Sequence, residues 1–99
     1  MPIGGVEVDE RALADVCRRY GLAELSVFGS RARGDADPDS DVDLLFVVRP
    51  GAHLGWRIEQ LNDELEGLFG HRVDLVSKRT VHPLIRHDVL DSARVLYAA

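Results

Sequence analysis

The chain has 99 residues, 45% of them hydrophobic, and a formal net charge of −5 from 12 Lys and Arg against 17 Asp and Glu. Chains usually divide into several domains only beyond about 200 residues, so residues 1–99 are expected to form one domain. The acidic balance argues against a long nucleic acid as partner, because binding its phosphates requires a basic surface. A single cysteine and the lack of an apolar run of ~18 residues exclude an internal disulfide and a membrane span, and predict a cytoplasmic protein.

Helical and strand patterns alternate along the sequence in short blocks, which predicts an α/β (α+β) fold. The segment 42–48 has β-branched and aromatic residues on both faces, so it is expected to be a central strand. In chain order, the sequence predicts a helix over 10–20, a strand over 25–28, a polar loop over 31–40, a strand over 42–48, a helix from Leu54 up to Gly70, a strand over 73–76, a helix from Pro83, and over 94–97 either a fourth strand or a continued helix.

The ends of these helices are marked by particular residue types. Asp9 can cap the first helix by accepting hydrogen bonds from its free amides. Gly21 and Gly70 can adopt the left-handed conformation that commonly ends a helix, and Pro83 suits a first turn. The last helix has an apolar stripe made of Leu84, Ile85, Val89 and Leu90.

Acidic residues crowd at the start of the strand over 42–48. Asp41 and Asp43 stand at i and i+2, so they would present two carboxylates on the same face. Carboxylates that close repel unless a hard cation such as Mg²⁺ lies between them. Asp74 lies inside the apolar run 73–76, where an ionised carboxylate needs a partner, and on a neighbouring strand it would complete a three-carboxylate cluster.

The turn Gly29-Ser30 supplies groups that suit a phosphate. Gly29 has no side chain to block the approach of a phosphate to the backbone, and Ser30 adds a hydroxyl and an amide at a helix start. The turn lacks the lysine of a Walker loop, and the acids lack the glycine and glutamate positions of an EF-hand. The sequence thus predicts a small phosphate cradle beside an acidic metal site.

Several other residues favour ordinary structural roles. Cys17 falls on an apolar helical stripe, and Trp56 is expected to pack beneath a loop more readily than to bind a base or a partner. The four histidines show no zinc-ligand spacing. Exposed solvating roles are expected for the remaining charged residues of the loop, which are Arg31, Arg33, Asp35, Asp37 and Asp39.

The run from Gly29-Ser30 through ten residues to Asp41-Val42-Asp43 resembles the signature of the polymerase-beta-type nucleotidyltransferase superfamily, with Asp74 as its third carboxylate. Most of the chain resembles minimal nucleotidyltransferase (MNT) antitoxins, which are encoded beside HEPN-domain RNase toxins. The resemblance implies a small mixed β-sheet flanked by helices. It also implies a type VII-like toxin–antitoxin pair in which AMP passes from Mg-ATP to a tyrosine of the toxin, with which the chain would form a hetero-oligomer.

The resemblance further implies the role of each site residue. Asp41, Asp43 and Asp74 would be the catalytic carboxylates and would hold two Mg²⁺ ions, with Asp74 nearer the nucleophile. Gly29 and Ser30 would hold the β- and γ-phosphates of ATP, which leave as pyrophosphate. The acceptor hydroxyl must come from another molecule.

Two alternatives stay open on the sequence alone. The chain could neutralise a toxin by contact, with little or no catalysis, although contact does not require three clustered carboxylates that oppose folding. It could instead transfer a nucleotide to a small molecule, although related enzymes of that kind use a further helical domain to close over the acceptor.

Overall fold

The structure is a computed structural model that describes residues 2–34 and 37–99. Its centre is a four-stranded mixed sheet with the order β5-β4-β3-β6, in which only β4 and β5 run parallel. The strands are β1 (Pro2–Ile3), β2 (Val6–Glu7), β3 (Leu22–Phe28), β4 (Val42–Val48), β5 (Val73–Ser77) and β6 (Arg94–Ala98), and the α-helices are α1 (Glu10–Arg19), α2 (Ser30–Arg33), α3 (Ile58–Phe69) and α4 (Pro83–Ser92).

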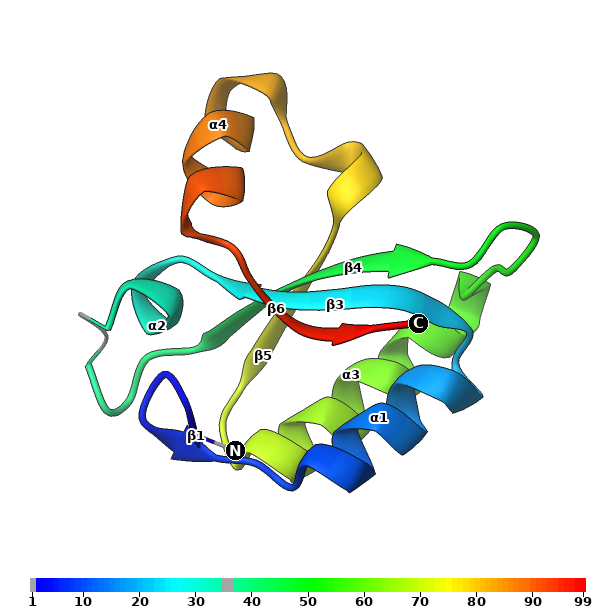
Figure 1. Cartoon of the computed structure of the whole chain (residues 1–99), viewed down its shortest axis with the longest axis horizontal. Helices are drawn as coiled ribbons and strands as arrows, with labels where there is room; N and C mark the ends of the chain where they lie inside the picture. Colours follow the sequence, from blue (N-terminus) through cyan, green and yellow to red (C-terminus); the bar gives the residue numbers. More distant parts are fainter. Residues whose placement is uncertain (1, 35–36) are drawn as a thin grey trace.

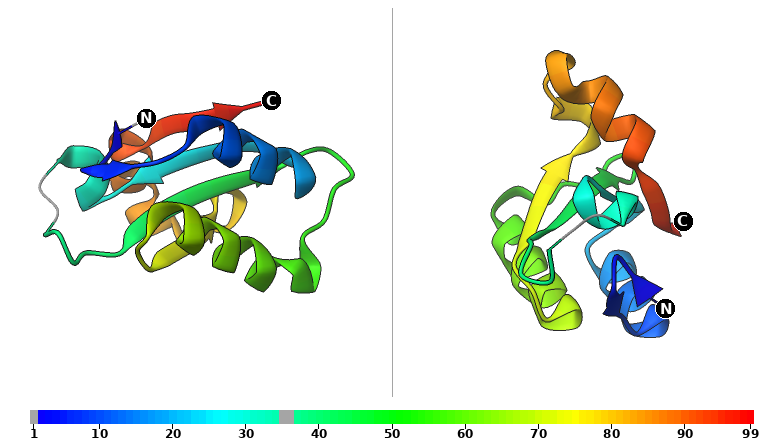
Figure 2. Two further views of the ribbon diagram at one scale, coloured as in Figure 1. Left: turned by 90° about the horizontal axis from the view of Figure 1, so that it is seen from below. Right: turned by 90° about the vertical axis from the view of Figure 1, so that its left-hand side faces the viewer.

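The helices lie on two sides of this sheet. Helices α1 and α3 cover one face side by side, and α4 stands on the other face (Figures 1 and 2). The larger core cluster lies on the α1/α3 side and contains Leu13, Leu44 and Leu61, all of them buried. A smaller cluster of Leu45, Val81 and Val89 lies on the α4 side. Consecutive residues of β4 thus enter different clusters, which confirms a central strand covered on both faces.

The predicted helix ends are confirmed. The Asp9 side chain accepts hydrogen bonds from the amides of Arg11 and Ala12 at 3.0 and 3.2 Å. Gly21 and Gly70 follow α1 and α3 with φ of +70° and +67°, a conformation that a side chain would strain. The start of α1 and the ends of α1 and α3 therefore depend on local backbone chemistry that the sequence already shows.

Some expectations about the elements were wrong. The sequence analysis missed the short hairpin of β1 and β2, because strands of two residues have no periodicity. The expected loop over 31–40 begins inside α2, and the helix expected from Leu54 begins with a 3-10 turn over Gly55–Arg57 before α3. The apolar stripe of α4 is largely outside the core, since only Val89 of this helix is buried. Residues 94–97 lie in a strand, as one alternative held.

In the described part of the chain, no helix has both the length and the apolar character needed to cross a lipid bilayer.

Candidate active site

Asp43 lies at the second position of β4, on the face of the sheet that α4 covers. Side chains alternate along a strand, and Leu45, two residues further on, belongs to the cluster on the α4 side. Asp43 therefore points toward the same side, while Leu44 enters the core beneath α1 and α3. Asp41 immediately precedes the strand and is exposed. The two aspartates thus stand two residues apart at the start of β4, and the charge of Asp41 acts on Asp43.

Asp74 lies directly beside Asp43, on the neighbouring strand. The parallel register of β4 and β5 pairs Val42 with Val73 and Asp43 with Asp74. The Val42 amide donates to the Arg72 carbonyl at 2.8 Å, which fixes this register at the start of both strands. The expectation of a neighbouring strand is confirmed. Asp74 is exposed rather than buried, however, because β5 is an edge strand.

The electrostatics of the three aspartates centre on Asp43. Burial raises the pKa of its carboxyl, and the negative charges of Asp74 and Asp41 raise it further, while Arg33 lowers it. Asp43 is therefore costly to ionise, and a cation placed among the three carboxylates would remove that repulsion.

The donor set of these residues fits Mg²⁺, which prefers carboxylate oxygens. Within residues 2–34 and 37–99, no three His, Cys, Asp or Glu side chains already stand in a metal-ligating arrangement. Since Asp41 and Asp74 are exposed, their side chains are free to reorient toward an ion. Metal binding by this set stays a prediction.

The turn Gly29-Ser30 joins β3 to α2 directly against Asp43. Gly29 has φ of +74° and ψ of −151°, a region that only glycine adopts at low cost. A Cβ at this position would stand 2.7 Å from the Asp43 Oδ2 atom. Because position 29 has no Cβ, the turn can lie directly against Asp43. Because α2 has only four residues, the contribution of a helix dipole at Ser30 is small.

Arg31 is buried, which corrects the expectation of an exposed solubilising residue. It is 5% exposed, and its guanidinium donates to the carbonyls of Gly4, Pro38 and Ser40 at 2.9, 3.0 and 2.6 Å. Two of these carbonyls belong to the segment that leads into Asp41. Arg31 therefore anchors that segment and the N-terminal hairpin to α2. The sequence analysis missed this role because backbone acceptors from distant segments leave no pattern in a sequence.

Trp56 was expected to pack beneath a loop, and this prediction was wrong. Its side chain is 91% exposed, in the 3-10 turn that precedes α3. Cys17 is buried as expected, and burial raises the pKa of its thiol to about 11, so it is an unreactive core residue. Asp37 and Asp39 are exposed as expected, whereas Asp35 lies outside the described residues.

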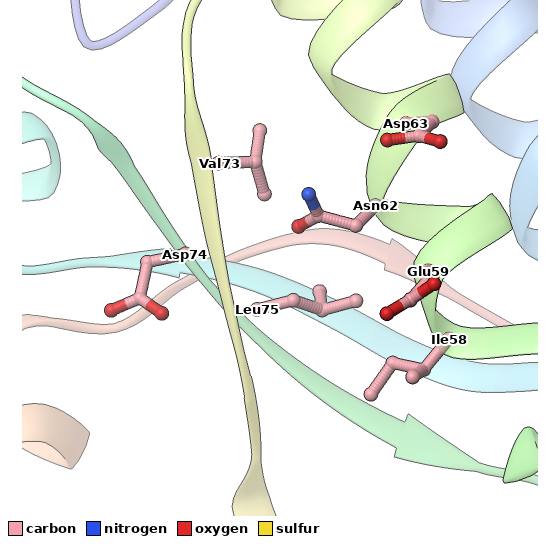
Figure 3. Close-up of a pocket in the computed structure, with 7 residues that line it drawn as sticks. All are labelled: Ile58, Glu59, Asn62, Asp63, Val73, Asp74 and Leu75. Carbon is pink, nitrogen blue, oxygen red and sulfur yellow. The ribbon is translucent and has the colours of Figure 1, made fainter. Parts of the chain in front are cut away.

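Asp74 is one of the residues that line a hollow on the α3 side of the sheet. This hollow, of about 450 Å³, lies between α3 and β5 and includes Glu59, Asn62 and Asp63. Figure 3 shows that the carboxylate of Asp74 points away from these side chains. The acidic site is therefore on the other face of the sheet, the face of α4.

A second hollow, of about 360 Å³, lies on the α4 side. It is lined by Arg33 of α2 and by three residues near the end of α4, which are Asp88, Asp91 and Ser92. Arg33 is also the residue whose positive charge lowers the pKa of Asp43. The sequence analysis assigned no role to these α4 residues, since their spacing from the signature motif is 45 residues or more.

The contact of the Gly29 turn with Asp43 and the pairing of Asp43 with Asp74 suit the nucleotidyl-transferring site that the sequence resemblance implies. Comparisons with known proteins identify the family. Residues 10–96 match the nucleotidyltransferase domain family. The chain is 46% identical over 72 residues to protein adenylyltransferase MntA of Thermococcus cleftensis, across 73% of this chain and 72% of MntA. The chain belongs to the nucleotidyltransferase domain family, among its protein adenylyltransferases.

Solved structures show the same fold. The chain superposes on a protein from a toxin–antitoxin structure with AMP-PNP, with a TM-score of 0.72 and 22% identity, over 93% of this chain and 75% of that one. It also superposes on a chain from a complex of the tri-AMPylated HEPN toxin of Shewanella oneidensis with MNT antitoxin, with a TM-score of 0.63 and 21% identity, over 91% and 70% of the two chains.

Proposed function

We propose that this chain is the antitoxin of a type VII-like toxin–antitoxin pair, and that it transfers AMP from Mg-ATP to a tyrosine hydroxyl of a HEPN-domain toxin. The observation that carries the proposal is the register of Asp43 with Asp74, with Gly29 packed on Asp43, in a protein adenylyltransferase. The toxin partner follows from the family resemblance and from the complexes that share the fold. Residues 1–99 act as one nucleotidyltransferase domain.

The roles of the site residues follow from their positions. Asp41, Asp43 and Asp74 would hold two Mg²⁺ ions, which would supply charge neutralisation for the triphosphate and a lowered pKa for an adjacent hydroxyl. Gly29 and Ser30 hold the β- and γ-phosphates, because the turn lies against Asp43 and offers a backbone position without a Cβ, followed by a serine hydroxyl. Arg31 keeps the segment before Asp41 in place through its three carbonyl contacts.

The reaction is an in-line displacement at the α-phosphorus of ATP. The tyrosine oxygen forms the new bond to phosphorus, the bond to the bridging oxygen breaks, and pyrophosphate leaves. The phenolic proton passes to Asp74 or through it to water, since Asp74 is an exposed carboxylate and the resemblance implies that it lies nearer the nucleophile. The toxin supplies the tyrosine, and it approaches from the α4 side of the sheet, where the aspartates face.

Neutralisation by contact alone is the second candidate, and the site itself argues against it. Burial and the two neighbouring carboxylates of Asp74 and Asp41 raise the pKa of Asp43, so its ionised form opposes folding, and a surface that only binds has no use for such a cluster.

The substitution Asp74→Asn tests the enzymatic reading against the contact reading. The change is isosteric, so we expect toxin binding in a pull-down to be retained while AMP transfer and rescue of toxin-expressing cells are both lost. The matched control is Asp63→Asn, which alters an exposed aspartate on the opposite face and should keep transfer and rescue. Rescue by Asp74→Asn without an AMP-sized mass increase on the toxin would refute enzymatic neutralisation.

A further inference from the structure

The last residue of α4, Ser92, is hydrogen-bonded to the turn of the candidate active site. Its hydroxyl accepts from the Gly29 amide at 3.1 Å and donates to the Val89 carbonyl at 3.2 Å. The hydroxyl proton is used by Val89, so the bond to Gly29 is an acceptor bond from the backbone amide. Residues 63 positions apart in the sequence are thereby joined.

This bond completes the set of contacts that fix Gly29. The carbonyl of Gly29 accepts from the amides of Ala32 and Arg33, both at 3.1 Å, and its Cα lies against Asp43. The amide is the remaining polar group of the residue, and Ser92 occupies it. A partly buried amide without a partner would favour rotation of the Phe28–Gly29 peptide toward water, and with it a change in the direction of Ser30.

We propose that Ser92 is a positioning residue for the nucleotide. It holds the Gly29-Ser30 turn in the conformation that receives the β- and γ-phosphates, and it acts through Gly29 rather than by touching the reacting atoms. The inference rests on the proposed function, because it assigns the phosphates to this turn. It also gives α4 a role in the site, since the hydroxyl at the end of this helix accepts the hydrogen bond from the Gly29 amide.

A competing arrangement predicts the opposite change in nucleotide affinity when the Ser92 hydroxyl is removed. If the phosphates needed the Gly29 amide itself, Ser92 would compete with the nucleotide, and its removal would tighten binding. Positioning predicts weaker binding instead. The direction of the change in nucleotide affinity therefore decides between the two.

The test compares Ser92→Ala with Ser92→Thr, which keeps a hydroxyl. The matched control is Thr80→Val, because Thr80 also donates to a carbonyl three residues earlier, that of Ser77, in a turn away from Gly29. The dissociation constant of Mg-AMP-PNP is measured by titration calorimetry, and KM and kcat for ATP are measured with the toxin as acceptor. Hydrogen exchange of the Gly29 amide is followed by NMR without nucleotide.

We expect Ser92→Ala to weaken Mg-AMP-PNP binding and raise KM about 3- to 10-fold, which corresponds to one hydrogen bond, with kcat within about twofold. Exchange of the Gly29 amide should accelerate. Ser92→Thr and Thr80→Val should behave like the wild type. A merely structural contribution of α4 would instead lower the melting temperature and leave KM unchanged.

Unchanged or tighter nucleotide binding by Ser92→Ala, or unchanged exchange of the Gly29 amide, would overturn the positioning role. Failure of the proposed function is recognised separately, because it would show in the wild type as an absence of Mg-AMP-PNP binding. The exchange measurement needs no nucleotide, so it tests the contact itself in either case.

Discussion

At the scale of single residues, the surroundings of Asp43 oppose the ionisation of its carboxyl. Its folded-state pKa is raised by burial and by Asp74 and Asp41, so its protonation is easier in the folded than in the unfolded chain. The ionised carboxylate therefore destabilises the folded state at neutral pH, and this penalty is lost as the pH falls through the raised pKa toward the ordinary value of 3.8.

We predict that Asp43→Asn stabilises the metal-free protein at pH 7 by about 0.2–1 kcal/mol, the range for like charges opposite each other on adjacent strands. The gain should shrink as the pH is lowered toward 3.8, as measured by urea unfolding with a chelator present. Asp39→Asn, at an exposed turn position outside the site, is the control and should change the free energy by less than about 0.5 kcal/mol. A gain for Asp43→Asn that grows toward acid would contradict the repulsion.

Gly29 is required for two reasons, its positive φ and the space that it leaves for Asp43, and two variants can separate these reasons. Gly29→Ala should destabilise the fold by about 1–3 kcal/mol because of its φ of +74°, and its Cβ should displace the Asp43 carboxylate and abolish AMP transfer. Gly34→Ala is the comparison variant, since it also places alanine at a positive φ, +83°, in the left-handed helical region, but its Cβ would meet nothing within 4 Å. It should lose about 1–2 kcal/mol and keep transfer. Equal loss of activity in both variants would show that strain alone matters.

Arg31 is expected to be a stability residue. Hydrogen bonds from a charged donor contribute about 1.5–3 kcal/mol each, and lysine cannot reproduce the forked geometry of Arg31 toward three carbonyls. We predict that Arg31→Lys lowers the free energy of unfolding by at least about 2 kcal/mol in urea. Arg86→Lys is the control, since Arg86 is exposed and donates to one carbonyl, that of Lys78. A loss below about 0.5 kcal/mol for Arg31→Lys would contradict this role.

At the scale of elements, α4 differs from the other long helices in how little of it is buried. Val89 is its one buried residue, whereas α3 buries Leu61, Leu65 and Phe69. Leu84 and Ile85 of α4 are 86% and 53% exposed. The stability of a helix in a protein comes mainly from packing of its apolar face, so α4 is weakly held.

We therefore predict that the amides of α4 exchange with solvent faster than those of α3, by tenfold or more, in hydrogen-exchange NMR of the isolated chain. The comparison is made at two protein concentrations. Protection of α4 equal to that of α3 at both concentrations would contradict the weak packing seen in the structure.

Most elements were predictable because their signals are local. The cap at Asp9, the left-handed glycines after α1 and α3, and the apolar content of β4 need no knowledge of the rest of the chain. The exposure of Leu84 and Ile85 was not predictable, because an apolar stripe shows that a helix can be buried but not what covers it.

The site was predictable in part for the same reason. The i, i+2 spacing places Asp41 and Asp43 together from local geometry alone. The pairing of Asp43 with Asp74 depends on strand order and register, which the resemblance supplied and the periodicity did not. Arg31 and Ser92 were missed because their partners are backbone groups of distant segments.

At the scale of the whole molecule, the two sides of the sheet differ in the residues that they contain. The side of α1 and α3 contains most of the buried core, and the side of α4 presents the aspartates, the Gly29-Ser30 turn and the end of α4. Figure 2 shows α1 and α3 on one side of the sheet and α4 on the other.

In the proposed function, Asp41, Asp43 and Asp74 carry out Mg²⁺-dependent transfer of AMP to the toxin. The most direct measurement is the intact mass of the toxin after incubation with this chain and Mg-ATP. We predict one or more AMP-sized increases with the wild type, and none with Asp41→Asn/Asp43→Asn or when a chelator removes the metal. An unmodified toxin with the wild type, or an undiminished mass increase with the double variant, would contradict the account.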